Sequence, residues 1–262
     1  MMLDLPWLTY LGVLLAGALA GYINTLAGSG SLITLPLLIF LGLPPTVANG
    51  TNRVGVLLQT LSATASFHRQ KVLNFRDGVI LLIPSTLGAL LGARIAVNLN
   101  EELMRQTIGV LMVLMLVVLF IQPNRWLVGR PEAIEKRPSW LQMILFFGIG
   151  VYGGFIQAGV GVFLLAGLVL SVGHDLVSAN ALKSFIVFGF TLVALIVFIM
   201  NDQVDWGMGI ILAIGNAAGA WVAAKTAVKK GAQFVRWLLI AVVIVSSLNL
   251  LGVFRLIGQL FQ

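Results

Sequence analysis

Long apolar stretches, separated by short polar interruptions, fill almost the whole chain. They cover residues 8–27, 31–43, 46–67, 78–97, 103–122, 140–158, 160–172, 176–200, 207–228 and 232–254. Most are close to the length of about 20 residues that a helix needs to cross a bilayer, whereas 31–43 and 160–172 are too short. The stretches are continuous and do not alternate with polar residues, so they predict helices and exclude a membrane β-barrel.

The composition explains where these helices lie. Of 262 residues, 59% are hydrophobic and only 10% are charged, and the mean hydropathy is +1.03. A soluble domain carries about 25% charged residues to cover its surface. We therefore expect an all-α integral membrane protein that crosses a membrane several times. The net charge of +7 lies mainly in loops, as in cytoplasmic loops of membrane proteins, and does not indicate nucleic-acid binding.

Unusual residues recur when the sequence is shifted by about 131 positions. The shift places Gly28 on Gly159, Gly30 on Gly161, Asn74 on Asp205, Arg94 on Lys225 and Arg105 on Arg236. Basic residues are scarce here, so their coincidence indicates an internal duplication. We predict a transmembrane repeat over residues 1–121, a cytoplasmic linker rich in proline and basic residues over 122–139, and a second repeat over 140–262.

The loops predict how each repeat faces. Residues 68–77 contain four basic or histidine side chains, whereas the equivalent loop 201–206 contains Asp202 and Asp205 and no lysine or arginine. Because basic loops stay in the cytoplasm, these two loops should lie on opposite sides. The repeats are then inverted, each with a leading hairpin (8–43 and 140–172) followed by three transmembrane helices, and the basic residues 225–236 form a further cytoplasmic loop. The alternative is a broken crossing in place of each hairpin, which gives eight spans and parallel repeats.

Glycines interrupt the leading segment of each repeat. Paired interruptions of this kind often mark the binding site of a transporter, although glycine also serves close helix packing. The candidate binding residues here are Asn24, Gly28, Ser29 and Gly30 in the first repeat, and Gln157 and Gly159 in the second.

One basic residue lies deep in the apolar helix that follows each interruption. Arg53 is about 10 Å and Lys183 about 12 Å from the start of its helix, at 1.5 Å per residue. No acidic residue lies deep in any apolar stretch, so a bound anion is the simplest partner for two stranded cations. The neighbouring candidates are Asn49, Thr51, Asn52, Gln59, Asn180 and Ser184. The alternatives are that both cations reach the membrane surface or bond carbonyls of a broken helix.

The chain contains no metalloprotease, serine-hydrolase or nucleotide-binding motif and no intramembrane metal-ligand cluster. We therefore expect neither an enzyme nor a cofactor or metal. Transport would be passive or coupled to an ion gradient.

These motifs resemble the TauE/SafE family of sulfite exporters and organosulfur-anion transporters. The resemblance is carried by residues 26–31 with Pro36, by the run Val47–Val54, by 175–183 and by 223–225, and it spans nearly the whole chain. The second repeat departs from the family pattern at Val160 and Phe163. The resemblance implies a proton-linked secondary transporter of sulfite or an organosulfonate that crosses the plasma membrane (the bacterial inner membrane) several times. An anion-selective channel, or a membrane-embedded enzyme or scaffold, remains the alternative.

Overall fold

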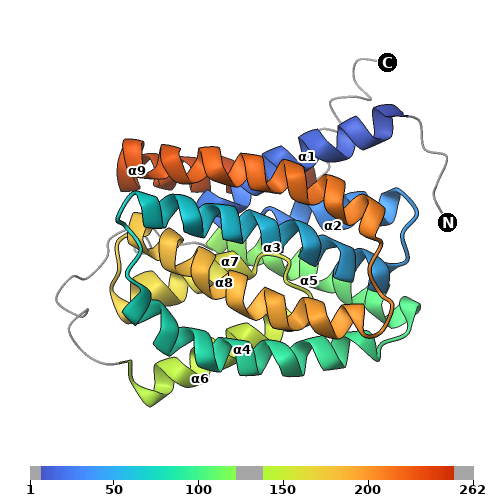
Figure 1. Ribbon diagram of the computed structural model, residues 1–262, viewed down its shortest axis with the longest axis horizontal. Helices are drawn as coiled ribbons and strands as arrows, with labels where there is room; N and C mark the ends of the chain where they lie inside the picture. Colours follow the sequence, from blue (N-terminus) through green and yellow to red (C-terminus); the bar gives the residue numbers. More distant parts are fainter. Residues whose placement is uncertain (1–6, 122–137, 251–262) are drawn as a thin grey trace.

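The computed structural model describes residues 7–121 and 138–250; side chains are described through residue 229, except Asp77 and residues 116–121. The regular elements of this part are all helical (Figure 1). They are α1 (Trp7–Ala27), α2 (Ser31–Phe40), α3 (Pro45–Arg69), α4 (Phe75–Val97), α5 (Glu101–Ile121), α6 (Trp140–Phe155), α7 (Val160–Ala166), the π-helix η3 (Gly167–Val172), α8 (Leu176–Ile199) and α9 (Trp206–Leu250).

Four helices within the described residues are long and apolar enough to cross a membrane, and they lie at Trp7–Ala27, Gly78–Val97, Leu176–Ile199 and Trp206–Lys229. The prediction of an all-helical, multi-pass membrane protein is confirmed. One boundary was wrong: no loop separates two helices at 225–236, because α9 is helical throughout that range. Most of the predicted linker, 122–137, lies outside the described residues.

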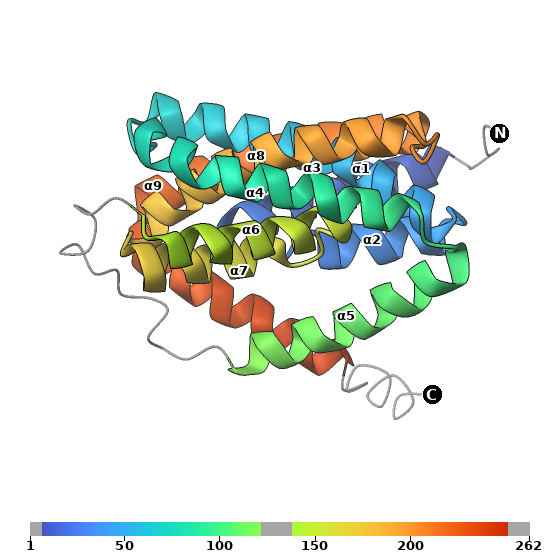
Figure 2. The ribbon, with the colours of Figure 1, turned by 90° about the horizontal axis from the view of Figure 1, so that it is seen from below.

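Each leading segment folds as a hairpin (Figure 2). In the first, α2 turns back along α1, so closely that a Cβ added to Gly30 would lie 2.2 Å from the carbonyl oxygen of Ala20. In the second, η3 ends beside the start of α6, where Gln142 Nε2 donates to the carbonyl oxygen of Ser171 at 2.6 Å. Both hairpins therefore return to the end from which they started.

Left-handed backbone positions recur at one fixed offset. Three pairs of residues 131 positions apart have positive φ: Gly28 (76°) and Gly159 (72°), Gly42 (96°) and Gly173 (99°), and Lys71 (59°) and Asp202 (54°). Glycine adopts this conformation without the steric cost of a Cβ, which accounts for four of these six residues. The two stretches of chain thus turn at matching positions.

The turns between long helices lie at opposite ends of the molecule. Figure 1 shows the α3–α4 turn at one end and the α8–α9 turn at the other. The α8–α9 turn lies against the start of α3, where Thr51 Oγ1 accepts a hydrogen bond from Asp205 N at 2.8 Å. It also contacts the end of α4, since Gln203 Nε2 donates to the carbonyl oxygen of Val97 at 3.1 Å.

The fourth helix of each half packs against the other half. It is α4 in the first half and α9 in the second, where α7 and η3 count as one segment. Helix α9 packs on α1 and α3, whereas α4 packs on α6 and α8. We call α1, α2, α3 and α9 the α1 body, and α4, α6, α7 and α8 the α6 body.

Glycines four positions apart form the contact between α1 and α9 and the contact between α4 and α6, as in small-xxx-small packing. They are Gly17 and Gly21 with Gly215 and Gly219 in the α1 body, and Gly88 and Gly92 with Gly150 and Gly154 in the α6 body. A Cβ on any of them would lie 1.9–2.9 Å from a carbonyl oxygen of the partner helix.

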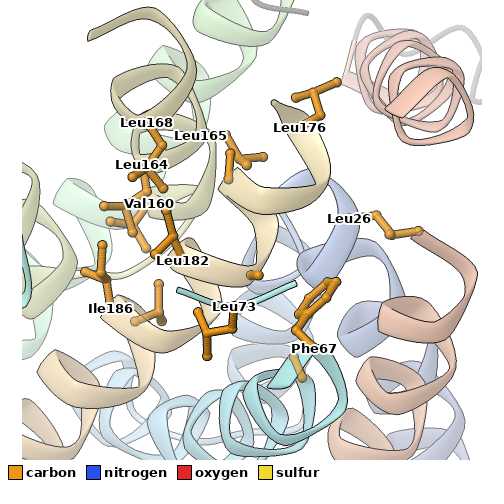
Figure 3. Packing of buried hydrophobic residues seen from close by; sticks show 14 of the residues in the cluster. Leu26, Phe67, Leu73, Val160, Leu164, Leu165, Leu168, Leu176, Leu182 and Ile186 are labelled. Carbon is orange, nitrogen blue, oxygen red and sulfur yellow. The ribbon is translucent and has the colours of Figure 1, made fainter. Parts of the chain in front are cut away.

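A buried apolar cluster joins the two bodies near the hairpin of the second half (Figure 3). Leu182 of α8 lies between Leu164 of α7 and Phe67 at the end of α3, and Ile186 lies one turn further along α8 (Figure 3). All four are fully or almost fully buried. Close packing of these side chains contributes to the docking of α3 on α8.

Candidate functional site

The two hairpin breaks touch each other inside the protein. A Cβ added to Gly161 would lie 2.4 Å from the Cα of Gly28, and one added to Gly28 would lie 2.3 Å from the carbonyl carbon of Gly161. Gly28 also has a φ of +76°. Only glycine allows this approach at both positions. The contact brings the interruptions of both halves, which the sequence marked separately, to one crossing point.

Arg53 of α3 reaches the end of α6. Its Nη2 donates to the carbonyl oxygen of Gly154 at 2.6 Å, and its Nη1 donates to that of Gly153 at 3.1 Å. Asn49 Oδ1 accepts from Nη2 at 3.5 Å, and the guanidinium carbon lies 4.5 Å from the ring centroid of Phe198. Arg53 has no exposed surface.

Lys183 of α8 makes the reciprocal contact with the end of α1. Its ammonium donates to the carbonyl oxygens of Asn24 and Thr25, both at 2.8 Å, and to Asn180 Oδ1 at 2.7 Å. The three protons of the ammonium therefore all have protein acceptors. Lys183 is 3% exposed.

The two arrangements correspond. Asn49 and Asn180 lie 131 positions apart, and each amide oxygen accepts from the cation of its own helix. Each cation lies at the C-terminal end of a helix that ends at a break, where exposed carbonyls carry partial negative charge. Among the described residues the partners of both cations are carbonyl and amide oxygens rather than carboxylates. Of the alternatives the sequence left open, the carbonyls of a broken helix are therefore the direct protein partners.

The first break is lined by polar groups. Asn24 Nδ2 donates to Gln59 Oε1 at 2.8 Å, and Asn24 Oδ1 accepts from Gly30 N at 3.2 Å. The hydroxyls of Thr25 and Ser29 are buried and have no hydrogen-bond partner. All of these residues except Thr25 are among the predicted binding residues.

The second break is less polar. Gln157 has a φ of +62° and its Nε2 donates to Thr191 Oγ1 at 2.5 Å. The Tyr152 hydroxyl donates to the carbonyl oxygen of Ala158 at 2.5 Å, beside Gly159. Position 190, which corresponds to Gln59, is the buried Phe190. The two breaks share a backbone path but differ in the side chains around them.

Three predicted residues have partners away from the crossing contact. Asn52 Oδ1 accepts from Thr34 Oγ1 of α2 at 2.6 Å. Thr51 holds the α8–α9 turn, as described above, and Ser184 Oγ donates back to the carbonyl oxygen of Asn180 at 2.8 Å.

The residues that sequence analysis missed are mostly backbone or hydroxyl groups. The carbonyls of Gly153 and Gly154 carry no side-chain signal. Thr191 could have been found from the internal duplication, because it lies 131 positions after Thr60. The structure buries both threonines. Asn216, buried against Gly21 and Gly55 with an amide oxygen that has no partner, was also missed.

Three buried N–H groups of the site have no hydrogen-bond partner: Arg53 Nε, Asn52 Nδ2 and Asn180 Nδ2. Buried donors are normally satisfied, so these three can bind an acceptor. The described residues include no group of three histidine, cysteine or acidic side chains that could hold a metal ion. The residues around the two breaks thus offer two buried cations together with unpaired N–H donors.

Comparison with known proteins identifies the family. The family model described as "Sulfite exporter TauE/SafE" matches residues 13–250. The chain belongs to this family. A "Probable membrane transporter protein ORF9" from Sinorhizobium sp is 30% identical over 96% of this chain and 95% of its own length. "Probable membrane transporter protein YfcA" from Escherichia coli K12 is 28% identical over 92% of this chain and 89% of its own length. No solved structure matches significantly.

Membership in the TauE/SafE family makes this chain a membrane transporter. The names of its relatives describe transport and not catalysis, which points away from an enzyme. These relatives are bacterial, which agrees with a multi-pass protein of the bacterial inner membrane.

Proposed function

We propose that this TauE/SafE protein is a secondary active carrier of a small anion, either sulfite or an organosulfonate, coupled to protons. The observation that carries the proposal is the pair of buried cations, Arg53 and Lys183, whose described partners include no carboxylate. Each break also brings together a C-terminal and an N-terminal helix end, whose opposite partial charges largely offset each other. Positive charge therefore remains at the crossing and favours a negatively charged substrate.

The two cations have different parts in this proposal. Lys183 has used all three of its protons on protein oxygens, so it supplies charge and holds the end of α1. Arg53 keeps a free Nε, and Asn52 and Asn180 each keep a free amide N–H. Charge-assisted hydrogen bonds from such groups are well suited to sulfur oxyanions. The direct ligands are thus Arg53, Asn52 and Asn180, with Ser29 close to the first break.

Alternating access would come from movement of the α1 body against the α6 body. Transporters of this architecture commonly rock one unit against another around a fixed central site. Because α4 and α9 pack on the opposite halves, the moving units would differ from the two sequence halves. The bonds of Arg53 and Lys183 and the Gly28–Gly161 contact lie between the two bodies.

Inverted repeats are part of the proposal. The matched left-handed positions support a duplicated backbone, and the opposite placement of the α3–α4 and α8–α9 turns supports inversion. The chain has no cysteine, so single cysteines can be introduced at Arg69 and Asp202. A membrane-impermeant thiol reagent should label them from opposite sides, and labelling from the same side would contradict inversion.

Transport in proteoliposomes tests the function. We expect uptake of sulfite or an organosulfonate, stimulated by a pH gradient, that falls at least tenfold in Arg53→Gln. The matched control is Arg69→Gln, which removes an exposed arginine at the end of α3. Unchanged flux in Arg53→Gln would refute the proposed site. Currents of single-channel size would favour an anion channel, but the closed contact at Gly28 and Gly161 favours a carrier.

A further inference from the structure

An apolar cavity of about 580 Å³ lies between α5, α6 and α7, and its lining includes none of the residues with unpaired N–H groups. In Figure 2, α5 runs obliquely beneath α6 and α7. The lining residues are Leu111, Leu114, Met115, Ile144, Leu145, Gly148, Ile149, Tyr152 and Phe163. Neither the family nor the proposed anion site accounts for this space.

The chemistry of the lining excludes a charged ligand. All but one of the lining side chains are aliphatic, aromatic or thioether groups, or glycine. The exception is the hydroxyl of Tyr152, which already donates to the carbonyl oxygen of Ala158 at 2.5 Å. A sulfonate or other polar group would lose its hydration here and gain no hydrogen bond. The occupant must therefore be apolar.

The cavity opens sideways at the depth of lipid tails. Its outer residues Leu114, Ile144 and Leu145 are 51%, 59% and 43% exposed. Trp140, 68% exposed at the start of α6, is placed to anchor the helix at the membrane surface. At 1.5 Å per residue, Ile144 lies about 6 Å and Tyr152 about 18 Å below Trp140. Both depths fall within a hydrocarbon layer about 30 Å thick.

The inner end of the cavity is the second hairpin break. Met115 packs so closely on the break that its methyl carbon would lie 2.3 Å from a Cβ on Gly159. Tyr152 and Phe163 meet edge to face, with ring centroids 5.3 Å apart. An occupant of the cavity would therefore contact the residues that hold the break in place.

We propose that an acyl chain of a membrane lipid enters between α5 and α6 and occupies this cavity, with its inner end against Met115, Tyr152 and Phe163. The mouth at tail depth and the apolar walls together favour an acyl chain over a water-soluble ligand. This inference needs only the membrane setting and does not depend on the identity of the transported anion.

Photo-cross-linking in vesicles tests the inference. The probe is a phosphatidylglycerol with a diazirine in the middle of one acyl chain. We expect it to label Met115, Tyr152 or Phe163 at the inner end of the cavity. A Cβ on Gly148 meets nothing within 4 Å, so Gly148→Phe can place a ring in the cavity, and we expect at least a tenfold loss of this labelling.

Gly12→Phe is the matched control, since Gly12 of α1 also has nothing within 4 Å of a Cβ and does not line the cavity. Labelling of the inner residues should be unchanged in it. Thermal unfolding and labelling of residues 7–27 check that each variant is folded, and Gly148→Leu is the smaller substitute if the phenylalanine variant is not.

Two results would overturn the inference. They are the absence of label on the inner residues of the wild type and equal label in folded Gly148 variants. Loss of label on adding excess organosulfonate would likewise assign the cavity to the tail of the transported anion. The labelling assay measures no transport and needs no gradient, so its failure is distinct from failure of the transport proposal.

Discussion

Lys183 donates a hydrogen bond of 2.8 Å to the carbonyl oxygen of Thr25, a residue 158 positions earlier in the chain. Arg53 makes the opposite connection to Gly154, 101 positions later, at 2.6 Å. Each body thus holds the end of a broken helix that belongs to the other body. Relative movement of the bodies would stretch these bonds directly, which links the charges to the conformation of the breaks.

Replacing Lys183 by methionine should lower both stability and transport. The change leaves the carbonyl oxygen of Thr25 without its donor, whereas that of Asn24 still accepts from Gly28 N at 2.8 Å. A buried group left unsatisfied costs about 1–3 kcal/mol. We expect a lower Tm in detergent and flux at background. The control is Lys225→Met, since Lys225 is exposed on α9 with its ammonium 5.1 Å from the Trp221 ring. An unchanged Tm in Lys183→Met would show that these bonds contribute nothing.

Arg53→Lys should keep the positive charge but lose the paired N–H donors of the guanidinium. A guanidinium holds two carbonyls at once in a fixed geometry, whereas an ammonium is a point charge on a shorter chain of atoms. We expect at least a tenfold fall in anion flux, with a smaller loss of Tm than in Arg53→Met. Arg69→Lys, at an exposed site, is the control. Full flux in Arg53→Lys would mean that charge alone matters at this position.

Alanine at Gly28 should be far more damaging than alanine at Gly42. Both glycines have positive φ, 76° and 96°, and an alanine in that region costs about 1–2 kcal/mol. A Cβ on Gly42 meets nothing within 4 Å, but one on Gly28 would lie 2.3 Å from the backbone of Gly161. We therefore expect Gly42→Ala to fold with a modest fall in Tm and Gly28→Ala to lose folded yield. Equal effects would argue against the close contact.

Asp175, which caps α8 just outside its first turn, should make stability depend on acid pH. Partial burial acts to raise the pKa of its carboxyl, but hydrogen bonds from Ser178 and Val177 and the nearby His174 outweigh burial and lower it below the ordinary 3.8. The folded state therefore favours the carboxylate. This contribution to stability is complete above about pH 4 and is lost as pH falls through the folded pKa.

Two variants separate the cap from its charge. Asp175→Ala should lower the free energy of unfolding by about 1 kcal/mol at neutral pH, the usual value of an N-cap. Asp175→Asn keeps an acceptor for the Val177 and Ser178 amides but does not titrate, so its Tm should change less than that of the wild type between pH 5 and pH 3, a range of about two units around the carboxyl pKa. An identical acid profile in the wild type and Asp175→Asn would contradict this assignment.

The helices could be predicted from the sequence because a lipid bilayer requires long apolar stretches whose backbone N–H and C=O groups are hydrogen-bonded to each other. The range 176–200 became α8 (Leu176–Ile199), and 160–172 became α7 and η3. The exchange of α4 and α9 between the halves could not be read, since it depends on glycine backbones that meet across long sequence separations. In the sequence, nothing about Gly17 and Gly21 shows that they contact α9 and not another helix.

The candidate site was only partly predictable for a related reason. Scarce charge in an apolar stretch marked Arg53 and Lys183 as buried, and the structure buries both. Their partners are main-chain carbonyls, and every residue type presents the same carbonyl. The basic residues near 225–236 indicated a loop by the charge rule, yet local helix propensity continued α9 through them.

The exchanged fourth helices have a consequence for the ancestry of the chain. Neither half of the gene encodes a self-sufficient bundle: expressed alone, the first half would present the groove of Gly17 and Gly21 with nothing to fill it. A second copy inserted upside down could supply the missing helix, and would receive one in return. On the inversion proposed above, a single-repeat ancestor would work only as an antiparallel pair, and co-expressing the two halves as separate polypeptides should restore what neither achieves alone.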